Sequence, residues 1–445
     1  MTLFCNSLNL LNLIIVSLFK YLPLQKIKKD FMTDTVMTKA KYFKLILILG
    51  SLTALGPFSI DMYLPGFAGI AKDLNTTVAN VSMTLSSYFI GISAGQLLYG
   101  PLLDRFGRKK PLFIGLLVYI LASLGCVFVT DIDTFIGLRF IQAIGSCAAT
   151  VASVSMVRDL FPVKDIPKVF SLLMLVVGLS PMLAPTIGGY ITEDYGWHIV
   201  FFILMCMGIL ILLAAQMGLP NTFKPDTSIS LKPKPIITNF ISIVKEPQFY
   251  TYAFTGAIAF SGLFTYVAAS PILFMDIFKV DGKTYGWIFA FMSLSFIGAS
   301  QLNSFLLRKF TSEQMIFGAL ISQTIISISF LVLAMNNLLG LYETIAMLFL
   351  FLACLGISNP NTAGLTLAPF SRNAGSASAL MGAIQLGLGA LASFAVGIFV
   401  KDSMLPMVLI MTVSTILALT ILIFGKRNIK KTITTSHDEG IVIVH

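Results

Sequence analysis

The chain has 445 residues, of which 56% are apolar and only 11% are charged. A soluble domain carries roughly 25% charged residues, so this chain lacks the polar surface that a soluble protein needs. Its formal net charge of +10 raises the question of nucleic acid, but the basic residues are scattered between apolar stretches rather than gathered on one face. The composition therefore indicates a polytopic membrane protein, and we expect no nucleic-acid partner.

The first 40 residues are interpreted as an N-terminal extension. An apolar run from Leu8 to Leu24 is interrupted by Lys20 and Pro23 and is followed by further lysines. Because the positive charge follows the run, the pattern is not that of a cleavable signal peptide. Two interpretations stay open, an interfacial amphipathic segment and a translation start at Met32 or Met37.

Apolar stretches close to the roughly 20 residues that cross a bilayer recur from Leu45 onward. We count twelve predicted spans, at about 45–65, 82–102, 111–130, 134–156, 168–190, 199–219, 249–271, 284–306, 315–335, 341–361, 375–399 and 404–425. The longest linker is polar and rich in proline, and it separates six spans from six. The sequence therefore predicts an all-α polytopic membrane protein.

The distribution of lysine and arginine supports this topology. If both termini and alternate loops face the cytoplasm, that side holds 25 Lys and Arg residues and the opposite side holds four, with Arg139 inside a span. Such an asymmetry is what the positive-inside rule predicts. The predicted segments are the extension 1–40, a six-helix bundle 41–219, a cytoplasmic linker 220–247, a six-helix bundle 248–427 and a cytoplasmic tail 428–445.

A weak internal repeat indicates that the two bundles are related. Residues 102–106, Leu-Leu-Asp-Arg-Phe, resemble residues 306–310, Leu-Leu-Arg-Lys-Phe, at equivalent loops of the two halves. A duplicated six-span unit is the arrangement of many secondary transporters. We therefore expect two pseudo-symmetric six-helix bundles.

Two ionisable residues lie clearly within predicted spans, Asp61 in the first and Arg139 in the fourth. Charges are costly to bury in a membrane, so each is a candidate for function. A carboxylate near an arginine can take up and release a proton as its surroundings change. The alternatives are a structural pairing, or a place for Asp61 in the headgroup region. Gln142 and the aromatic Tyr88 complete the predicted substrate and proton site.

Two further stretches have unusual compositions. The loop from Gly100 to Lys110 combines two glycines with clustered charge, and we expect Gly100 and Gly107 to provide close backbone approach or positive φ at its bends. The fifth span contains two prolines and three glycines between Gly178 and Gly189, which favours a bent helix that packs closely on another. Generic close packing is the alternative.

The sequence gives no indication of catalytic or metal chemistry. It contains no GxxxxGK[ST] or HExxH motif, and its five cysteines occur singly without metal-ligand spacing. We expect no enzyme activity, no metal and no organic cofactor. A membrane-embedded enzyme, a channel and a non-transporting receptor remain as less favoured alternatives.

These segments together resemble the major facilitator superfamily, and within it the Bcr/CflA (bicyclomycin/chloramphenicol resistance) group of twelve-span drug:proton antiporters. The resemblance covers residues 45–427. It rests on the loop motif 100–109, the fourth-span motif 138–145 and the fifth-span motif 178–189. Residues 60–65 and 157–162 resemble the Bcr/CflA group itself.

The resemblance implies a major facilitator fold in the bacterial inner membrane and an exporter that exchanges its substrate for protons. It implies that Asp61 and Arg139 belong to the substrate and proton site. Gln142 lies in the same fourth-span motif, whereas Tyr88 is included as an aromatic candidate for the cavity lining, with packing or lipid contact as the alternative. It further implies a gating motif at Gly100, Asp104, Arg105, Gly107 and Arg108. The hinge or antiporter motif would comprise Gly178, Pro181, Pro185, Gly188 and Gly189.

We therefore expect proton-coupled efflux of small amphipathic molecules, driven by the proton gradient, by a monomer that works through alternating access. The alternative is a transporter of a physiological metabolite, such as an amino acid or sugar exporter or a nutrient importer.

Overall fold

A computed structural model describes residues 39–161, 165–220, 233–370, 374–400, 403–429, 433–435 and 441–443. The predictions for residues 1–38 therefore lie outside the described residues, as do those for residues 221–232 of the linker and for most of the tail. All contacts reported below lie within Lys44–His445.

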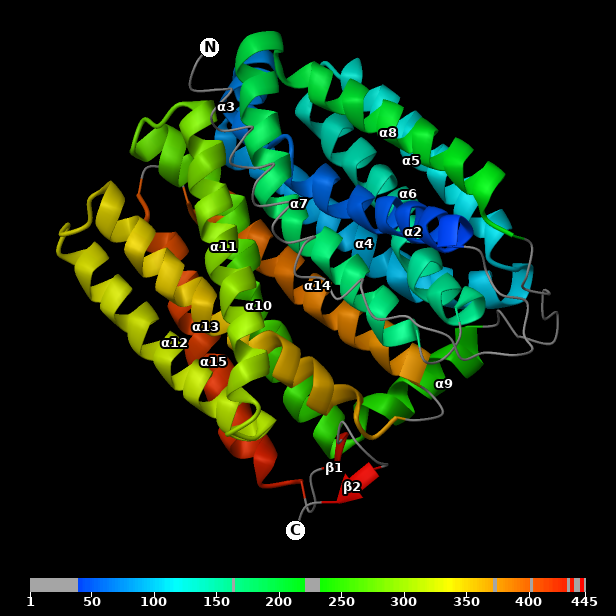
Figure 1. Cartoon of the computed structure of the whole chain (residues 1–445). Helices are drawn as coiled ribbons and strands as arrows, with labels where there is room; N and C mark the ends of the chain where they lie inside the picture. The colour runs from blue at the N-terminus through cyan, green and yellow to red at the C-terminus, as the bar shows by residue number, and fades with distance from the viewer. Residues whose placement is uncertain are drawn as a thin grey trace. The chain divides into compact units, whose positions relative to one another are not determined.

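The described chain is almost entirely helical (Figure 1). The first half contains α2 (Lys39–Asp61), the 3-10 helix η1 (Leu64–Gly66), α3 (Phe67–Asp73), α4 (Val78–Phe106), α5 (Lys109–Val127), α6 (Ile132–Leu160), α7 (Ile166–Tyr195) and α8 (Trp197–Gly218). The second half contains α9 (Pro233–Val244), α10 (Pro247–Pro271), the π-helix η3 (Ile272–Ile277), α11 (Gly282–Leu306), α12 (Ser312–Met335), α13 (Leu341–Leu367), α14 (Ala374–Phe399) and α15 (Leu405–Lys426). Two short strands, β1 (Ile433–Thr435) and β2 (Ile441–Ile443), pair in antiparallel orientation.

Twelve of these helical segments are long and apolar enough to cross a membrane, counted over the described residues. They correspond one to one with the predicted spans, so the predicted all-α class with twelve spans is confirmed. The linker holds a helix that was not predicted, α9, and the tail holds the two strands.

Local signals in the sequence explain where several helices begin and end. Asp131 precedes α6 and accepts a hydrogen bond from the Thr134 backbone N–H at 2.8 Å, which holds the pKa of Asp131 below its ordinary value. Asp281 caps α11 in the same way through Thr284. Gly107 ends α4 with φ of 84°, which satisfies the predicted need for positive φ.

Gly100 differs from its prediction. It lies inside α4, where an added Cβ would meet no atom within 4 Å, so neither a bend nor a close approach requires glycine there.

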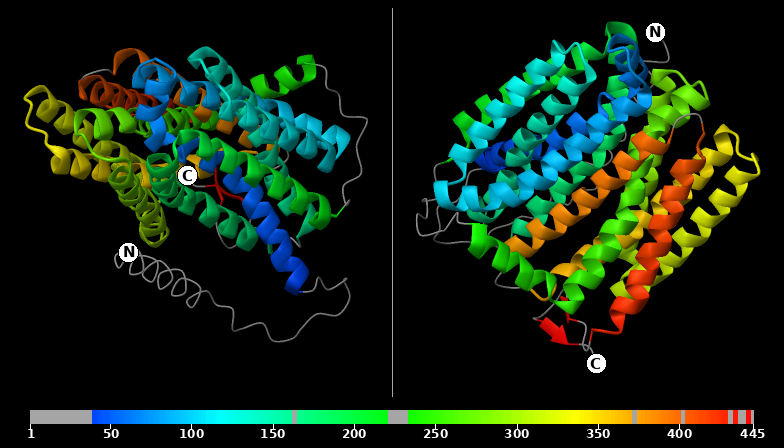
Figure 2. Two further views of the ribbon diagram at one scale, coloured as in Figure 1. Left: turned by 90° about the horizontal axis from the view of Figure 1, so that it is seen from above. Right: turned by 180° about the vertical axis from the view of Figure 1, so that it is seen from behind.

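The helices of Lys44–His445 form two groups that follow the order of the chain, as Figures 1 and 2 show. Within the first group α6 packs on α4 and α5, and within the second α13 packs on α11 and α12. The largest contacts between the groups are those of α4 with α14 and of α7 with α11. These two helix pairs form most of the interface between the two groups.

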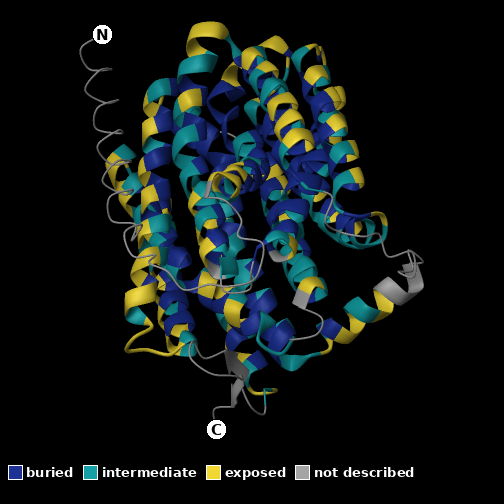
Figure 3. Ribbon diagram, turned by 45° about the vertical axis from the view of Figure 1, so that its right-hand side comes forward, coloured by how far each residue is buried: buried dark blue, intermediate teal, exposed yellow. Residues whose placement is uncertain are grey.

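Exposed residues lie along the outer faces of the helices (Figure 3), and many of them are large and apolar. Phe128 is 74% exposed and Met217 is 80% exposed, although both are large and apolar. A surface of this kind suits lipid rather than water, in agreement with the composition.

Candidate functional site

Arg139 lies at the centre of the first half. Its side chain is fully buried, and Nη2 donates a hydrogen bond to the backbone oxygen of Ser59 at 2.9 Å. Nη1 donates to Oε1 of Gln142, one turn further along α6. The guanidinium carbon lies 4.4 Å from the ring centroid of Tyr63 and 4.2 Å from that of Tyr88. Hydrogen bonds and cation–π contacts thus stabilise a charge that the membrane interior would otherwise disfavour.

A network of hydroxyl groups and one amide surrounds this arginine. Gln142 donates from Nε2 to Oγ of Ser123 at 2.7 Å, and Tyr88 shares a 2.8 Å hydrogen bond with Ser146. Ser59 shares a 2.7 Å bond with Tyr119. These bonds connect α2, α4, α5 and α6, so the arginine organises the packing of four helices. Arg139 Nε is buried without a hydrogen-bond partner among the residues that the structure describes.

Asp61 occupies the last position of α2 and is 5% exposed. Within the described part of the chain, its carboxylate forms no hydrogen bond and no ion pair, and Arg139 bonds instead to the backbone two residues earlier. The structure therefore brings Arg139, Gln142 and Tyr88 together and leaves the Asp61 carboxylate separate from them.

Two polar groups of the second half interact with Asp61. Its carboxylate interacts electrostatically with Tyr266 of α10 and Tyr285 of α11. Tyr285 shares a 2.8 Å hydrogen bond with Ser270, whereas the buried hydroxyl of Tyr266 has no partner among the described residues. Asp61 is therefore a first-half carboxylate that faces the second half.

The predicted gating motif forms a compact ion-pair cluster. Arg108 donates to Asp104 at 2.5 Å and to Asp159, at the end of α6, at 2.7 Å. Burial lowers the pKa of Arg108, but the hydrogen bonds to Asp159 and Asp104 more than offset this and hold the pKa above its usual value. The guanidinium of Arg105 lies 5.9 Å from the ring centroid of Phe106. The cluster joins the ends of α4 and α6.

The predicted hinge motif lies in α7, which runs without interruption through Pro181 and Pro185. A Cβ added at Gly188 would lie 1.9 Å from the backbone oxygen of Met62, and one added at Gly189 would lie 2.4 Å from that of Gly282. At Gly178 the nearest atom, in Ile297, is 3.7 Å away. At Gly188 and Gly189, only glycine permits α7 to lie so close to Met62, which follows α2, and to Gly282, the first residue of α11.

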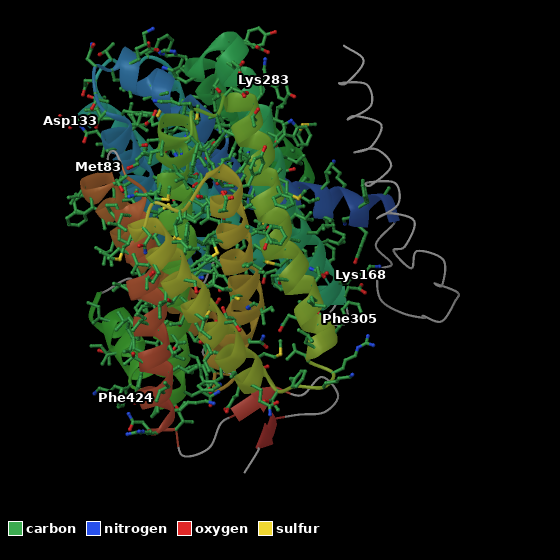
Figure 4. The ribbon with its side chains drawn as sticks, turned by 90° about the vertical axis from the view of Figure 1, so that its left-hand side faces the viewer. Met83, Asp133, Lys168, Lys283, Phe305 and Phe424 are labelled. Carbon is green, nitrogen blue, oxygen red and sulfur yellow. The ribbon has the colours of Figure 1, made fainter. Side chains whose placement is uncertain are left out.

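This close packing lies at the end of the helices opposite the gating motif. Figure 4 shows Met83, Asp133 and Lys283 toward one end, and Lys168, Phe305 and Phe424 toward the other. At the first end, Lys283 of α11 forms ion pairs with Asp194 at 2.9 Å and Glu193 at 3.7 Å, both from α7. The two halves are thus joined there by glycine packing and by charge.

Several of these side chains are not distinguished by the sequence. Asp159 lies in the stretch 157–162 that resembles the Bcr/CflA group, and Lys283, Glu193 and Tyr285 have no local signal that distinguishes them from ordinary polar or aromatic residues. Their partners are distant in sequence, so only the fold brings them together. Over the described residues, no group of three or more His, Cys, Asp or Glu side chains is placed to hold a metal ion.

The arrangement of twelve spanning helices in two halves is that of a secondary transporter. Residues 49–394 match the family model described as the Major Facilitator Superfamily. The chain belongs to this superfamily, whose members are transporters rather than enzymes, and the predicted family is confirmed.

Proteins with related sequences carry names from drug resistance. The chain is 32% identical over 389 residues to a bicyclomycin resistance protein homolog of Haemophilus influenzae. This alignment covers 87% of this chain and 98% of the relative. It is 29% identical to the multidrug resistance protein MdtL of Citrobacter koseri, over 82% of this chain and 94% of the relative. A chloramphenicol resistance protein of Pseudomonas aeruginosa is 27% identical, over 66% of this chain and 70% of the relative.

Solved transporter structures share the fold. A bacterial homolog of the human lysosomal transporter Spinster, in an inward-facing and occupied conformation, superimposes with a TM-score of 0.69 at 13% identity, covering 88% of this chain and 98% of that one. A D-xylose–proton symporter gives a TM-score of 0.68 at 15% identity, covering 86% and 97%. Both confirm the major facilitator fold.

Proposed function

We propose that the protein is a proton-coupled exporter of small amphipathic molecules, such as bicyclomycin-like or chloramphenicol-like drugs, in a bacterial inner membrane. The names of the relatives support the kind of cargo. The observation that carries the coupling to protons is Asp61, a buried carboxylate without an ion-pair partner in the described chain, at the interface of the two halves. A carboxylate in that position meets a different environment each time the halves move.

The charge distribution supports an orientation with both termini in the cytoplasm. In that orientation the gating motif is cytoplasmic, and the close packing of α7 on α11 lies on the periplasmic side. Asp104, Arg105 and Arg108 then control closure of the cytoplasmic side, and Gly189, which packs on Gly282 of α11, allows closure of the periplasmic side.

The coupling follows from differential stabilisation of two states. Protonation of Asp61 removes a negative charge that faces the second half, and the two conformations solvate that charge differently. Binding of a proton to Asp61 therefore favours one conformation, and binding of cargo favours the other. The bound proton thus promotes release of the cargo, and the bound cargo promotes release of the proton. Arg139 stabilises the helices around Asp61 and leaves the carboxylate free to titrate.

The replacement Asp61→Asn tests the proposal, with Asp61→Glu as the matched control that retains a titratable group. In proteoliposomes with an imposed pH gradient, we expect Asp61→Asn to abolish proton-driven uptake of chloramphenicol while purification yield and monomeric state stay unchanged. Asp61→Glu retains part of the uptake. Proton-driven uptake at the wild-type rate by Asp61→Asn would refute the coupling role.

A further inference from the structure

Helices α7 and α11 belong to different halves and run in opposite directions along one another. Near the Lys283 end, an added Cβ at Gly189 would lie 2.4 Å from the backbone oxygen of Gly282. Further along the pair, a Cβ added at Gly178 would lie 3.7 Å from the side chain of Ile297. Residues three or four positions apart share a helix face, so each helix presents one stripe of residues to the other.

Toward the gating-motif end, the same two stripes are exposed. At helical spacing the stripe of α7 continues through Leu175 and Ser171, and that of α11 continues through Gln301 and Ser304. All four residues are exposed, whereas residues packed against a partner helix would be covered. Figure 1 likewise shows α7 and α11 close together at their upper ends and apart at their lower ends. This helix pair is therefore closed at the Lys283 end and open at the other.

Two opposite charges lie at the separated ends of these helices. Asp165 occupies the N-cap position of α7, but its side chain makes no capping hydrogen bond. Arg308 follows the end of α11, and its exposed guanidinium lies 5.3 Å from the ring centroid of Phe305. Within the described residues, neither charge forms an ion pair. Each half thus carries one uncommitted charge at this end, and the two charges have opposite signs.

The internal repeat explains why Arg308 lacks a partner in its own half. Arg308 takes the place that Asp104 has in the first copy, and residues 306–310 contain no acid. Asp104 forms an ion pair within the first half. In the second half the next acid along the chain, Glu313, is paired with Lys426 at 2.8 Å. A carboxylate for Arg308 is therefore available from the first half rather than from its own.

The lengths of the two helices bring these charges to the same level. Asp165 lies 24 residues before Gly189, and Arg308 lies 26 residues after Gly282. At the rise of an α-helix these separations are about 36 Å and about 39 Å. Because the helices are antiparallel and Gly189 contacts Gly282, similar lengths measured from that contact place Asp165 opposite Arg308 once the helices align.

We propose that Asp165 and Arg308 form an ion pair when α7 and α11 align at this end, and that the pair stabilises the conformation opposite to the one described here. Lys283 and Asp194 join the two helices at the other end, so the halves exchange one ion pair for the other as they move. The second copy of the loop motif then acts with reversed charge. The exchange requires the movement of the halves that the proposed function assumes, but neither the proton nor the cargo.

Disulfide cross-linking between Ser171→Cys and Ser304→Cys, in a cysteine-free background in proteoliposomes, reports closure at this end. Both serines are exposed on the two stripes, so the cross-link requires the helices to approach. We expect Arg308→Gln and Asp165→Asn each to slow cross-linking about twofold to fivefold, the effect of an exposed ion pair. The exchanged pair, Asp165→Arg with Arg308→Asp, restores the rate.

Arg427→Gln is the matched control, because Arg427 is an exposed arginine at the end of α15, with its guanidinium 5.2 Å from the ring centroid of Phe424. It should leave the rate unchanged, and Lys283→Gln should raise the rate by weakening the opposite end. The proposal is overturned if the serine positions never cross-link, if Arg308→Gln cross-links as fast as Arg427→Gln, or if the exchanged pair fails to restore the rate. The assay uses no cargo and no pH gradient, so a failure of proton coupling is recognised separately.

Discussion

At the scale of single residues, Arg139 shows how a membrane protein holds a charge within its spans. Its guanidinium donates to a backbone carbonyl and an amide and lies between two tyrosine rings. The planar fork of arginine suits this arrangement, because its N–H groups point in several fixed directions. A lysine offers one compact ammonium and does not reproduce that geometry.

The replacement Arg139→Lys should therefore destabilise the protein although the charge is kept. Loss of one hydrogen bond to a charged group costs about 1.5–3 kcal/mol. We expect a decrease of that size in the free energy of unfolding in detergent, measured by denaturant titration. Arg105→Lys, in the loop motif, serves as the charge-matched control. Equal stability of Arg139→Lys and the wild type would contradict the network described here.

The residue types of the candidate site were predictable from the sequence, but their grouping was not. Asp61 and Arg139 stand out because charges within spans are rare. That Arg139 bonds to Ser59 and not to the Asp61 carboxylate depends on the register between α2 and α6, which no local pattern encodes. The same holds for Tyr266 and Tyr285, which interact with Asp61 from the other half.

At the scale of helices, the glycines of α7 set how closely the two halves approach. Gly189 contacts the backbone of Gly282 in α11, and a backbone carbonyl is unable to swing away as a long side chain does. The sequence predicted close packing for this segment, and α7 indeed packs on α11. It also predicted a need for glycine at position 100, which is wrong because Gly100 contacts nothing that a Cβ would displace.

Replacing Gly189 by alanine should shift the balance of conformations. The added Cβ would lie 2.4 Å from the backbone oxygen of Gly282 in the other half, and overpacking of this kind costs about 1–3 kcal/mol. We expect Gly189→Ala to disfavour the closed state at this end. The rate of cross-linking between cysteines introduced by Asp194→Cys and Lys283→Cys, in a cysteine-free background, reports that closure and should decrease.

Gly298→Ala is the control for this measurement, because an added Cβ at that position of α11 meets no atom within 4 Å. It should leave the cross-linking rate unchanged. If Gly189→Ala cross-links as fast as the wild type, the glycine contact does not limit the approach of the helices.

At the scale of the whole molecule, the number of spans and the class of fold followed from the sequence. Hydropathy and the asymmetry of positive charge are global properties, and they depend little on any single contact. The interface between the halves was less predictable, because the pairs Lys283–Asp194 and Lys283–Glu193 join residues that lie far apart along the chain. Helix α9 was missed because its prolines favoured an irregular linker.

The proposed orientation predicts the outcome of reporter fusions. A green fluorescent protein fused after His445 should fluoresce in the bacterial cytoplasm. Alkaline phosphatase fused at Lys279, one of the four lysines assigned to the opposite side, should be active. An active phosphatase after His445 together with an inactive one at Lys279 would reverse the topology.

The central claim, that cargo and proton compete through Asp61, is tested most directly by proton release on binding. Purified protein in weakly buffered detergent solution with a pH-sensitive dye is mixed with chloramphenicol, and the protons released are counted. The account predicts release from the wild type in proportion to the chloramphenicol bound, and none from Asp61→Asn at the same occupancy. Binding without release by the wild type, or equal release by the two proteins, would contradict it.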